Sequence, residues 1–304
     1  MIICTTPAEM QTACRDQRAS GLTLGLVPTM GALHAGHMSL VAAARAECDR
    51  VAASIFVNPT QFGPNEDFAA YPRTFEEDCR QLESAGVDIL FAPTASGMYP
   101  AGNTTFVDPG EIATRLDGAS RPGHFRGVAT IVARLFHIVA PGRAYFGQKD
   151  AAQVAVLRHI VRDLNFPVHI AVCPIVREPD GLAMSSRNRY LSPEERSRAP
   201  VLSRSLAAAE SLARGGETYA ETLRAAILAV FAESESGRPE TILDYAAIVD
   251  PDSLLPVAEC SQGALIAVAA WVGATRLIDN LLLAHKAGCN RQESLVSCLT
   301  PQPC

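Results

Sequence analysis

The sequence lacks several features that would assign it to a specialised class of protein. Its 26 basic residues are outnumbered by 32 acidic ones, which gives a net charge of -6 and a pI near 5.7. A sequence-independent nucleic-acid binder needs clustered lysine and arginine to release phosphate counterions, so we expect no nucleic-acid partner. Small anionic ligands remain compatible with this charge.

Long apolar runs are also lacking. The apolar stretch at 264–273 falls well short of the ~18 residues that a membrane-spanning helix needs. The first residues show no basic segment followed by an apolar one, which is the pattern of a secretory signal. We therefore expect a cytoplasmic protein with no membrane partner.

The nine cysteines include no CxxC pair and are scattered along the chain. An odd, scattered set argues against a disulfide framework and against a structural zinc site. We interpret these cysteines as buried or incidental thiols.

The remaining composition is that of a globular protein. Hydrophobic residues make up 48% of the 304 residues and charged residues 19%, which excludes a disordered or coiled-coil chain. A single core stops growing near ~250 residues, so one large domain and a smaller one are expected.

Apolar runs and helical stripes alternate over the first half of the chain. Continuous apolarity is typical of strands that are covered on both faces, as in a parallel sheet. The order predicts an α/β fold, a Rossmann-like doubly wound parallel sheet over residues 1–176. The expected strands are 22–27, 51–57, 87–93, 144–147 and 168–176, and the expected helices cover about 37–47, 127–140 and 154–164.

The pattern changes after residue 176 and predicts a smaller α+β domain over 177–284. Ser192, Pro193 and Glu195 have the spacing of a capping box, which starts a helix that runs toward Gly215. We expect residues 285–304 to be a frayed tail. The other elements expected are a helix at about 218–232 and apolar runs at 241–249, 264–271 and 275–283.

The most specific motif is the loop 28–37, which lies between an expected strand and an expected helix. A helix N-terminus favours phosphate, and glycines at 31 and 36 let the backbone approach a ligand closely. His34 and His37 are three residues apart and can face the same ligand. A bare HxxH is more often a structural pair, and zinc is the weaker option because no third ligand has helical spacing.

Two further segments carry suitable chemistry. The chain has 24 arginines but only two lysines, at 149 and 286, so Lys149 indicates a place that needs a compact ammonium group, although chance is the alternative. In the loop at 184–188, two hydroxyls and Arg187 form a clamp suited to a polyphosphate. Taken alone, such a loop is more often a solvated linker.

Six blocks, in order, resemble one known family. They read PTMGALHAGH, FVNPTQF, YPRT, SRPGHFRG, FGQKD and DGLAMSSRNRYL. Over about residues 1–284 the chain is similar to the pantoate–beta-alanine ligases, which belong to the nucleotidyltransferase superfamily related to class I aminoacyl-tRNA synthetases. The resemblance implies a Rossmann-like domain that binds ATP and pantoate, with the C-terminal domain closing over the site.

The resemblance also implies the reaction. ATP and (R)-pantoate form a pantoyl-adenylate and pyrophosphate, and beta-alanine then displaces AMP to give pantothenate. His37 would be the proton donor, and His34, Lys149 and Arg187 the other catalytic groups. The residues implied to bind ATP are Met30, Gly31, Ala32, Leu33, His34, Ala35, Gly36, His37, Gly147, Gln148, Lys149, Asp150, Val176, Met184, Ser185, Ser186 and Arg187.

The remaining implied contacts concern the other substrates and the metal. Gln61 and Gln153 would hold pantoate, with Gln61 also near beta-alanine, and Arg121 and His124 would be further substrate contacts. Asp78, or Glu77 beside it, would be the carboxylate for Mg²⁺ that accompanies ATP. No tightly bound organic cofactor is implied, and the family resemblance implies a homodimer.

The expected chemistry is consistent with these residues. A carboxylate that attacks the α-phosphorus brings two anions together, so the site must supply positive charge, and no protein nucleophile is needed. Two alternatives are a plain nucleotidyltransferase acting on a phosphate-bearing acceptor and a nucleotide-binding regulatory module without activity. The first usually has Phe-Asp where this loop has Pro-Thr-Met, and the second should have lost the charged groups that are present here.

Overall fold

Six parallel strands form the large sheet of the molecule. The computed structural model describes residues 1–64, 66–235 and 241–284. The strand order is β1, β4, β3, β2, β5, β6, so the chain direction across the sheet reverses between β2 and β5. Ligand sites in such sheets lie at the carboxyl ends of the strands beside this reversal. The strands are β1 (Ile2–Cys4), β2 (Leu24–Thr29), β3 (Arg50–Ile55), β4 (Ile89–Phe91), β5 (Arg143–Gly147) and β6 (His169–Cys173).

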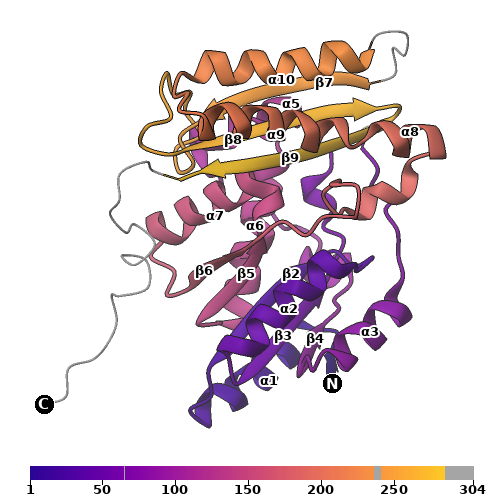
Figure 1. The fold of residues 1–304 in the computed structure, drawn as a ribbon. Coiled ribbons are helices and arrows are strands. Elements are labelled where there is room, and N and C mark those ends of the chain that lie inside the picture. The colour runs from indigo at the N-terminus through magenta and orange to yellow at the C-terminus, as the bar shows by residue number, and fades with distance from the viewer. Residues whose placement is uncertain (65, 236–240, 285–304) are drawn as a thin grey trace, which may run out of the picture.

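Helices cover both faces of this sheet, which confirms the doubly wound prediction (Figure 1). One face packs on α1 (Pro7–Ala19), α6 (His124–Val139) and α7 (Ala151–Asp163). The other packs on α2 (Ala35–Glu47) and α3 (Phe75–Ser84). Alternate residues of the central strands β2, β3, β4 and β5 enter the two cores, so a continuous apolar run is required there.

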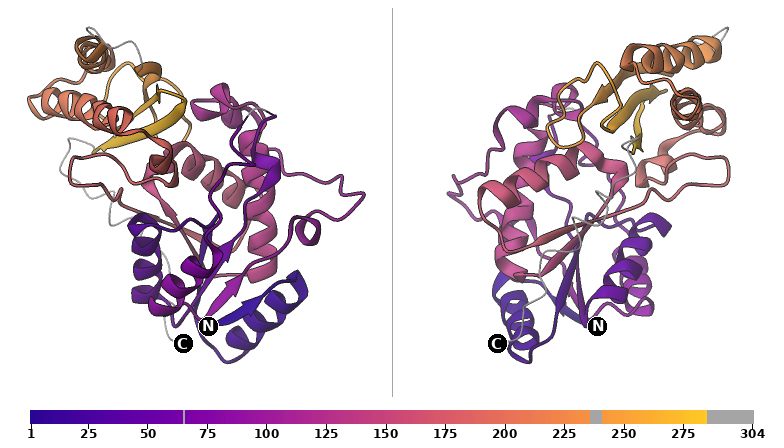
Figure 2. Two further views of the ribbon diagram at one scale, coloured as in Figure 1. Left: turned by 90° about the vertical axis from the view of Figure 1, so that its right-hand side faces the viewer. Right: turned by 60° about the vertical axis from the view of Figure 1, so that its left-hand side comes forward.

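The small sheet is antiparallel and is likewise buried on both faces. It consists of β7 (Thr241–Val249), β8 (Ala264–Val272) and β9 (Thr275–Leu283), in that order. Ile266 and Val268 of β8 pack in the core with α9 (Val201–Arg214) and α10 (Ala220–Glu235), whereas Leu265 and Ala267 join the core of α6 and α7. The small sheet and its helices therefore form a layer at one end of the large sheet (Figure 2).

The helix predicted to run from 193 toward Gly215 is instead two helices. The capping box at its start is confirmed: the Ser192 hydroxyl accepts from the Glu195 N–H at 3.2 Å, and Glu195 accepts from the Ser192 N–H at 2.7 Å. However, α8 ends at Arg198 and α9 begins at Val201. Pro200 separates them because proline has no N–H and its ring clashes with a helical carbonyl four residues earlier.

The first two elements, β1 and α1, were not predicted. The signal for α1 was present, since Thr6 and Glu9 form the same type of capping box, with Pro7 at the first helical position. The expected tail at 285–304 lies outside the described residues. The shorter helices are α4 (Ala95–Met98), α5 (Asp117–Ser120) and α8 (Pro193–Arg198), with 3₁₀ turns η1 (Pro59–Gln61), η2 (Gly110–Thr114), η3 (Gln148–Asp150) and η4 (Ser186–Tyr190).

The cysteines of the described residues are all free thiols, and most of them are buried: Cys4, Cys14, Cys48, Cys79, Cys173 and Cys260. In the same part of the chain, the helices are all too short or too polar to cross a membrane.

Helix α6 approaches the η1 turn so closely that Gly127 has no room for a side chain. A Cβ at this position would lie 2.3 Å from the Thr60 carbonyl oxygen and 2.6 Å from the Gln61 Cα. Alanine favours a helix by about 1 kcal/mol over glycine, but a backbone clash outweighs this gain. We expect Gly127→Ala to lower the free energy of unfolding by about 1–3 kcal/mol, measured by urea denaturation.

Gly142→Ala is the matched control, because an added Cβ there meets nothing within 4 Å. Its stability should stay within about 0.5 kcal/mol of wild type. A Gly127→Ala protein as stable as the control would contradict the proposed close packing of α6 on η1.

Candidate active site

A cavity opens at the carboxyl ends of β2, β3, β5 and β6, beside the reversal of strand order. Segments far apart in the sequence meet there, and they carry most of the residues singled out from the motifs. The predicted residues that line it are Met30, His34, Gly36, His37, Gln61, Arg121, His124, Gly147, Lys149, Asp150, Gln153, Val176, Met184, Ser185, Ser186 and Arg187.

Several residues predicted to bind ATP do not line the cavity in this structure. Gly31, Ala32, Leu33 and Ala35 do not line the cavity, and neither does Gln148, whose amide is bonded to the small sheet. In this structure these residues form the backbone of the loop 28–37 and of the turn at Gln148.

The two histidines cap the start of α2. His34 is the N-cap residue, and its Nδ1 accepts a hydrogen bond from the Gly36 N–H at 3.1 Å. The Nδ1 of His37 accepts from the His34 N–H at 3.3 Å. A Cβ at Gly36 would lie 2.8 Å from the His34 ring, so a side chain there would displace the imidazole that caps the helix.

These bonds fix the protonation of both rings. Because each Nδ1 accepts from a backbone N–H, the proton of each neutral ring is on Nε2. Burial lowers the pKa of His34 to about 4, assisted by the Lys149 charge. Burial also lowers the pKa of His37 to about 3, with a contribution from His34. Near neutral pH the site therefore presents two neutral imidazoles, each with an Nε2–H that can donate to an anionic ligand.

Asp78 holds the loop that leads to the histidines. It is only 1% exposed, and its two oxygens accept from the N–H groups of Ala32 and Leu33, both at 2.9 Å. Gly31 and Ala32 have positive φ values of 82° and 51°, so this loop needs external support. The carboxylate is buried behind the cavity and both of its oxygens are engaged by the backbone, while its predicted role as a magnesium ligand stays a prediction.

The cationic side chains differ in how firmly they are paired. Arg187 donates twice to Asp67, at 3.0 and 2.9 Å, and although burial opposes ionisation, these bonds lower the pKa of Asp67. The Nζ of Lys149 lies 3.5 Å from the nearest Asp150 oxygen. Lys149 is thus the more loosely paired of these two cations and the more available to a ligand.

Arg121 and His124 hold the segment that carries Gln61. The guanidinium of Arg121 pairs with Glu66 at 2.9 and 2.6 Å and contacts the Nε2 of His124 at 3.1 Å. His124 in turn donates from Nδ1 to the Gln61 carbonyl at 2.8 Å. Burial lowers the pKa of His124 to about 4, assisted by Arg121. Both residues line the cavity, but these internal bonds occupy their polar atoms.

Sequence reasoning did not identify Asn58 as part of the site. Its Nδ2 donates to the Gln61 Oε1 at 3.0 Å, and its Oδ1 accepts from the Tyr99 hydroxyl at 2.8 Å. This orients the Gln61 amide so that Nε2 points toward Met30. Asn58 lies within the FVNPTQF block, which was the available signal.

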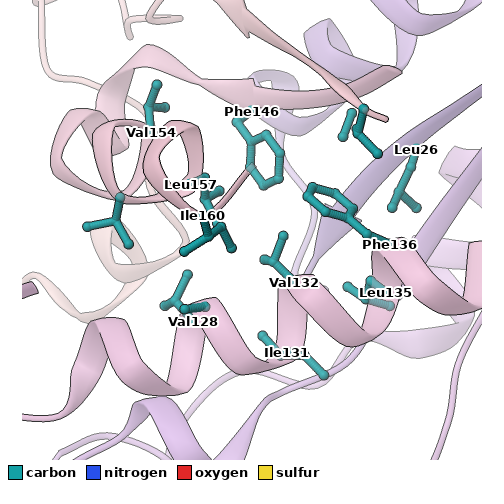
Figure 3. Close-up of a cluster of buried hydrophobic side chains, with 14 of the residues drawn as sticks. Leu26, Val128, Ile131, Val132, Leu135, Phe136, Phe146, Val154, Leu157 and Ile160 are labelled. Atoms are coloured by element: carbon teal, nitrogen blue, oxygen red, sulfur yellow. The ribbon is translucent and has the colours of Figure 1, made fainter. Parts of the chain in front are cut away.

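An apolar wall completes the cavity, and it too was missed. The helical stripe of α6 was interpreted as core, but its residues Val128, Ile131, Val132 and Leu135 also line the cavity. Figure 3 shows this stripe together with Phe146 of β5 and residues of α7. One side of the site is therefore apolar.

The loop at 184–187 contacts the histidine loop directly. The Ser186 hydroxyl donates to the Ala32 carbonyl at 3.2 Å and accepts from the Tyr71 hydroxyl at 3.4 Å. The predicted phosphate clamp is thereby placed opposite the start of α2.

The donor set fits a magnesium ion that arrives with a nucleotide better than a resident ion. Within the described ranges, no group of three or more His, Cys, Asp or Glu side chains could hold a metal. Asp150 is the only carboxylate among the described residues that line the cavity. Mg²⁺ commonly uses one or two carboxylates together with substrate phosphates and water.

These features define a class of protein: a Rossmann-like enzyme with a histidine-capped helix N-terminus suited to nucleotide phosphates. The family described as pantoate-beta-alanine ligase matches residues 2–282. The chain belongs to this family, and the protein is a ligase.

Relatives support this assignment along nearly the whole chain. The pantothenate synthetase of Acidobacterium capsulatum is 61% identical over 291 residues, covering 92% of this chain and 96% of its own. The crystal structure of the enzyme from Thermus thermophilus is 50% identical with a TM-score of 0.85, covering 92% and 99%. The enzyme from Francisella tularensis, crystallised with beta-gamma ATP and beta-alanine, is 36% identical with a TM-score of 0.74, covering 93% and 97%.

Acidification should destabilise the protein through its buried histidines. His124, with its pKa lowered to about 4, stays neutral in the folded protein at a pH where the unfolded chain binds a proton. The unfolded state therefore binds more protons below its pKa of 6.5, and stability falls as the pH drops toward 4. Between about pH 6.5 and 5 this loss is about 1.5 kcal/mol for one such histidine.

Urea denaturation across this range checks the effect. His124→Gln should reduce the loss of stability on acidification by about the amount of one histidine. His137→Gln, at an exposed position of the same helix, is the control for the loss of a histidine side chain as such. Identical pH dependence in the His124 variant and wild type would show that His124 protonates equally in both states.

Proposed function

We propose that this protein joins (R)-pantoate to beta-alanine at the expense of ATP, through a pantoyl-adenylate, releasing pyrophosphate and AMP. The observation that carries this proposal is one cavity that brings together His34, His37 and Lys149 with Gln61 and Gln153. Membership of the ligase family supports the same reaction.

The adenylation step depends on placing charge. The pantoate carboxylate attacks the α-phosphorus of ATP, a P–O bond forms, and the bond to pyrophosphate breaks. Lys149, as the loosely paired cation, would stabilise the charge that develops on the phosphates. The Nε2–H groups of His34 and His37 would donate to phosphate oxygens, and the dipole of α2 adds to this effect.

The other side of the cavity suits pantoate. This acid carries two hydroxyls and two methyl groups. The amides of Gln61 and Gln153 can both donate to and accept from hydroxyls, and the apolar wall of α6 would contact the methyl groups. Beta-alanine would then attack the acyl carbon of the adenylate near Gln61, and AMP would leave.

We also propose a metal ion, a compartment, an oligomeric state and a domain division for the enzyme. Mg²⁺ would accompany ATP, with Asp150 as the acidic group nearest to it, and would neutralise phosphate charge. The free thiols suit a reducing compartment such as the cytoplasm, and the family resemblance supports a homodimer. The boundary between an ATP- and pantoate-binding domain (1–176) and a C-terminal domain (177–284) that closes over the site belongs to the same proposal.

The order of the two steps can be tested by isotope exchange. With ATP, Mg²⁺ and pantoate but no beta-alanine, labelled pyrophosphate should appear in ATP, because adenylation is reversible and complete in itself. Adding beta-alanine should give AMP and pantothenate. Exchange that requires beta-alanine rather than pantoate would contradict this order, and nucleotide transfer to a phosphate-bearing acceptor would point to the alternative enzyme.

The role of Lys149 can be tested by substitution. Lys149→Ala should slow adenylate formation in a single turnover by roughly 10²–10³-fold, as for the loss of one transition-state donor. Affinity for ATP should change far less, because the contact strengthens as charge develops. Lys149→Arg should restore little, since a planar guanidinium cannot occupy the same point. Near-normal turnover in both folded variants would remove Lys149 from the catalytic groups.

A further inference from the structure

Strand β9 carries the buried polar residues Asp279 and Asn280 together with the largely buried Arg276. Asp279 and Asn280 are 2% and 3% exposed, and the Arg276 side chain is 12% exposed. Burying such groups is unfavourable unless each is hydrogen-bonded. In Figure 1, β9 (yellow) is the strand of the small sheet on the side of α7. The hydrogen-bond and ion-pair partners of these three side chains show which segments this strand holds in place.

Asn280 holds the turn that carries Lys149. Its Nδ2 donates to the main-chain carbonyls of Gln148 and Lys149, both at 2.9 Å. Its Oδ1 accepts from the Gln148 side-chain amide at 3.0 Å. One side chain thus satisfies two successive carbonyls of η3, which sets the direction from which the Lys149 side chain enters the cavity.

Asp279 holds the hairpin that leads into the 184–187 loop, the second segment implied to bind ATP. Its carboxylate accepts two bonds from Arg177, at 2.6 and 3.0 Å. Arg177 pairs with Ala183 across an antiparallel bridge, and the N–H of Met184 donates to the Val176 carbonyl at 2.9 Å. The ion pair therefore anchors the hairpin that leads into the 184–187 loop.

Arg276 reaches a third segment. It pairs with Asp117 of α5 at 2.8 Å and with Asp244 of β7 at 2.8 Å. The α5 helix leads directly to Arg121, whose bonds support Gln61. Residues of one strand thus support three separate walls of the cavity.

We propose that Asn280 is a positioning residue for adenylation, which fixes the main chain of Gln148 and Lys149 so that the Lys149 ammonium meets the ATP phosphates. Asp279 and Arg276 give parallel support to the other two walls. This inference rests on the proposed function, because it assigns Asn280 to the first of its two steps.

The informative substitution is Asn280→Asp. It keeps the size and the acceptor but replaces the donating amide by a carboxylate facing two carbonyl oxygens. A misplacement of about 1 Å can cost on the order of 10²-fold in rate, so we expect single-turnover adenylate formation to fall by about 10- to 100-fold. Reaction of preformed pantoyl-adenylate with beta-alanine should change less than about 3-fold, because that step has no pyrophosphate leaving group to stabilise.

Leu277→Ala is the matched control on the same strand. Leu277 is buried in the core with α9 and α10, so its truncation should lower the melting temperature without moving η3. Well below the melting temperature, its adenylation rate should stay within about 2- to 3-fold of wild type. A purely structural role for Asn280 would make Asn280→Asp behave like this control, with a lowered melting temperature and both half-reactions close to wild type.

A second readout does not depend on catalysis. Amide hydrogen exchange in the substrate-free protein should be at least about 10-fold faster over 147–151 in Asn280→Asp than in wild type, and unchanged there in Leu277→Ala. Unchanged exchange over this segment, or an unchanged adenylation rate in Asn280→Asp, would overturn the proposal. If wild type showed no pantoate-dependent exchange of pyrophosphate into ATP, the proposed function would fail. The amide hydrogen exchange over 147–151 would still decide whether Asn280 holds the turn.

Discussion

The site depends first on one buried carboxylate. Asp78 accepts from the N–H groups of Ala32 and Leu33, in a loop where Gly31 and Ala32 both have positive φ values. Leaving such buried groups unpaired would cost about 1–3 kcal/mol each. Because Asp78 satisfies them, the chain can turn sharply enough for His34 to cap α2 and for both imidazoles to present Nε2–H to the cavity.

Local sequence signals predicted the parts of the fold that depend on local physics. The capping box at Ser192 and the doubly wound order of strands and helices follow from spacing and periodicity, and both are found. The break at Pro200 could have been read from the sequence by the same rules. The role of Asp78 could not be predicted in this way, because a carboxylate on a helix looks the same in sequence whether it binds a metal or two amides that lie 45 and 46 residues away.

The candidate site shows the same division. The histidines and Lys149 were identified from their place at strand ends, and the glutamines from the family resemblance. Asn58 and the α6 stripe were missed because their role depends on neighbours: an amide that orients another amide, and core residues that also line the cavity. Arg121 was expected to contact substrate, but its donors engage Glu66, His124 and Gln61.

The contacts between the two sheets limit how the site can admit its substrates. Moving the small sheet as a body would uncover Leu265 and Ala267, at about 25 cal/mol for each Å² of apolar surface, and would break the bonds of Asn280 to η3. The side chains of the ion pair between Arg187 and Asp67 are each about a quarter exposed, so this pair can be reached without moving either sheet. Under the proposed function, an incoming phosphate would replace the Asp67 carboxylate as the partner of Arg187 without separating the two sheets. Exchange of ionic partners within the cavity therefore costs less than separation of the sheets.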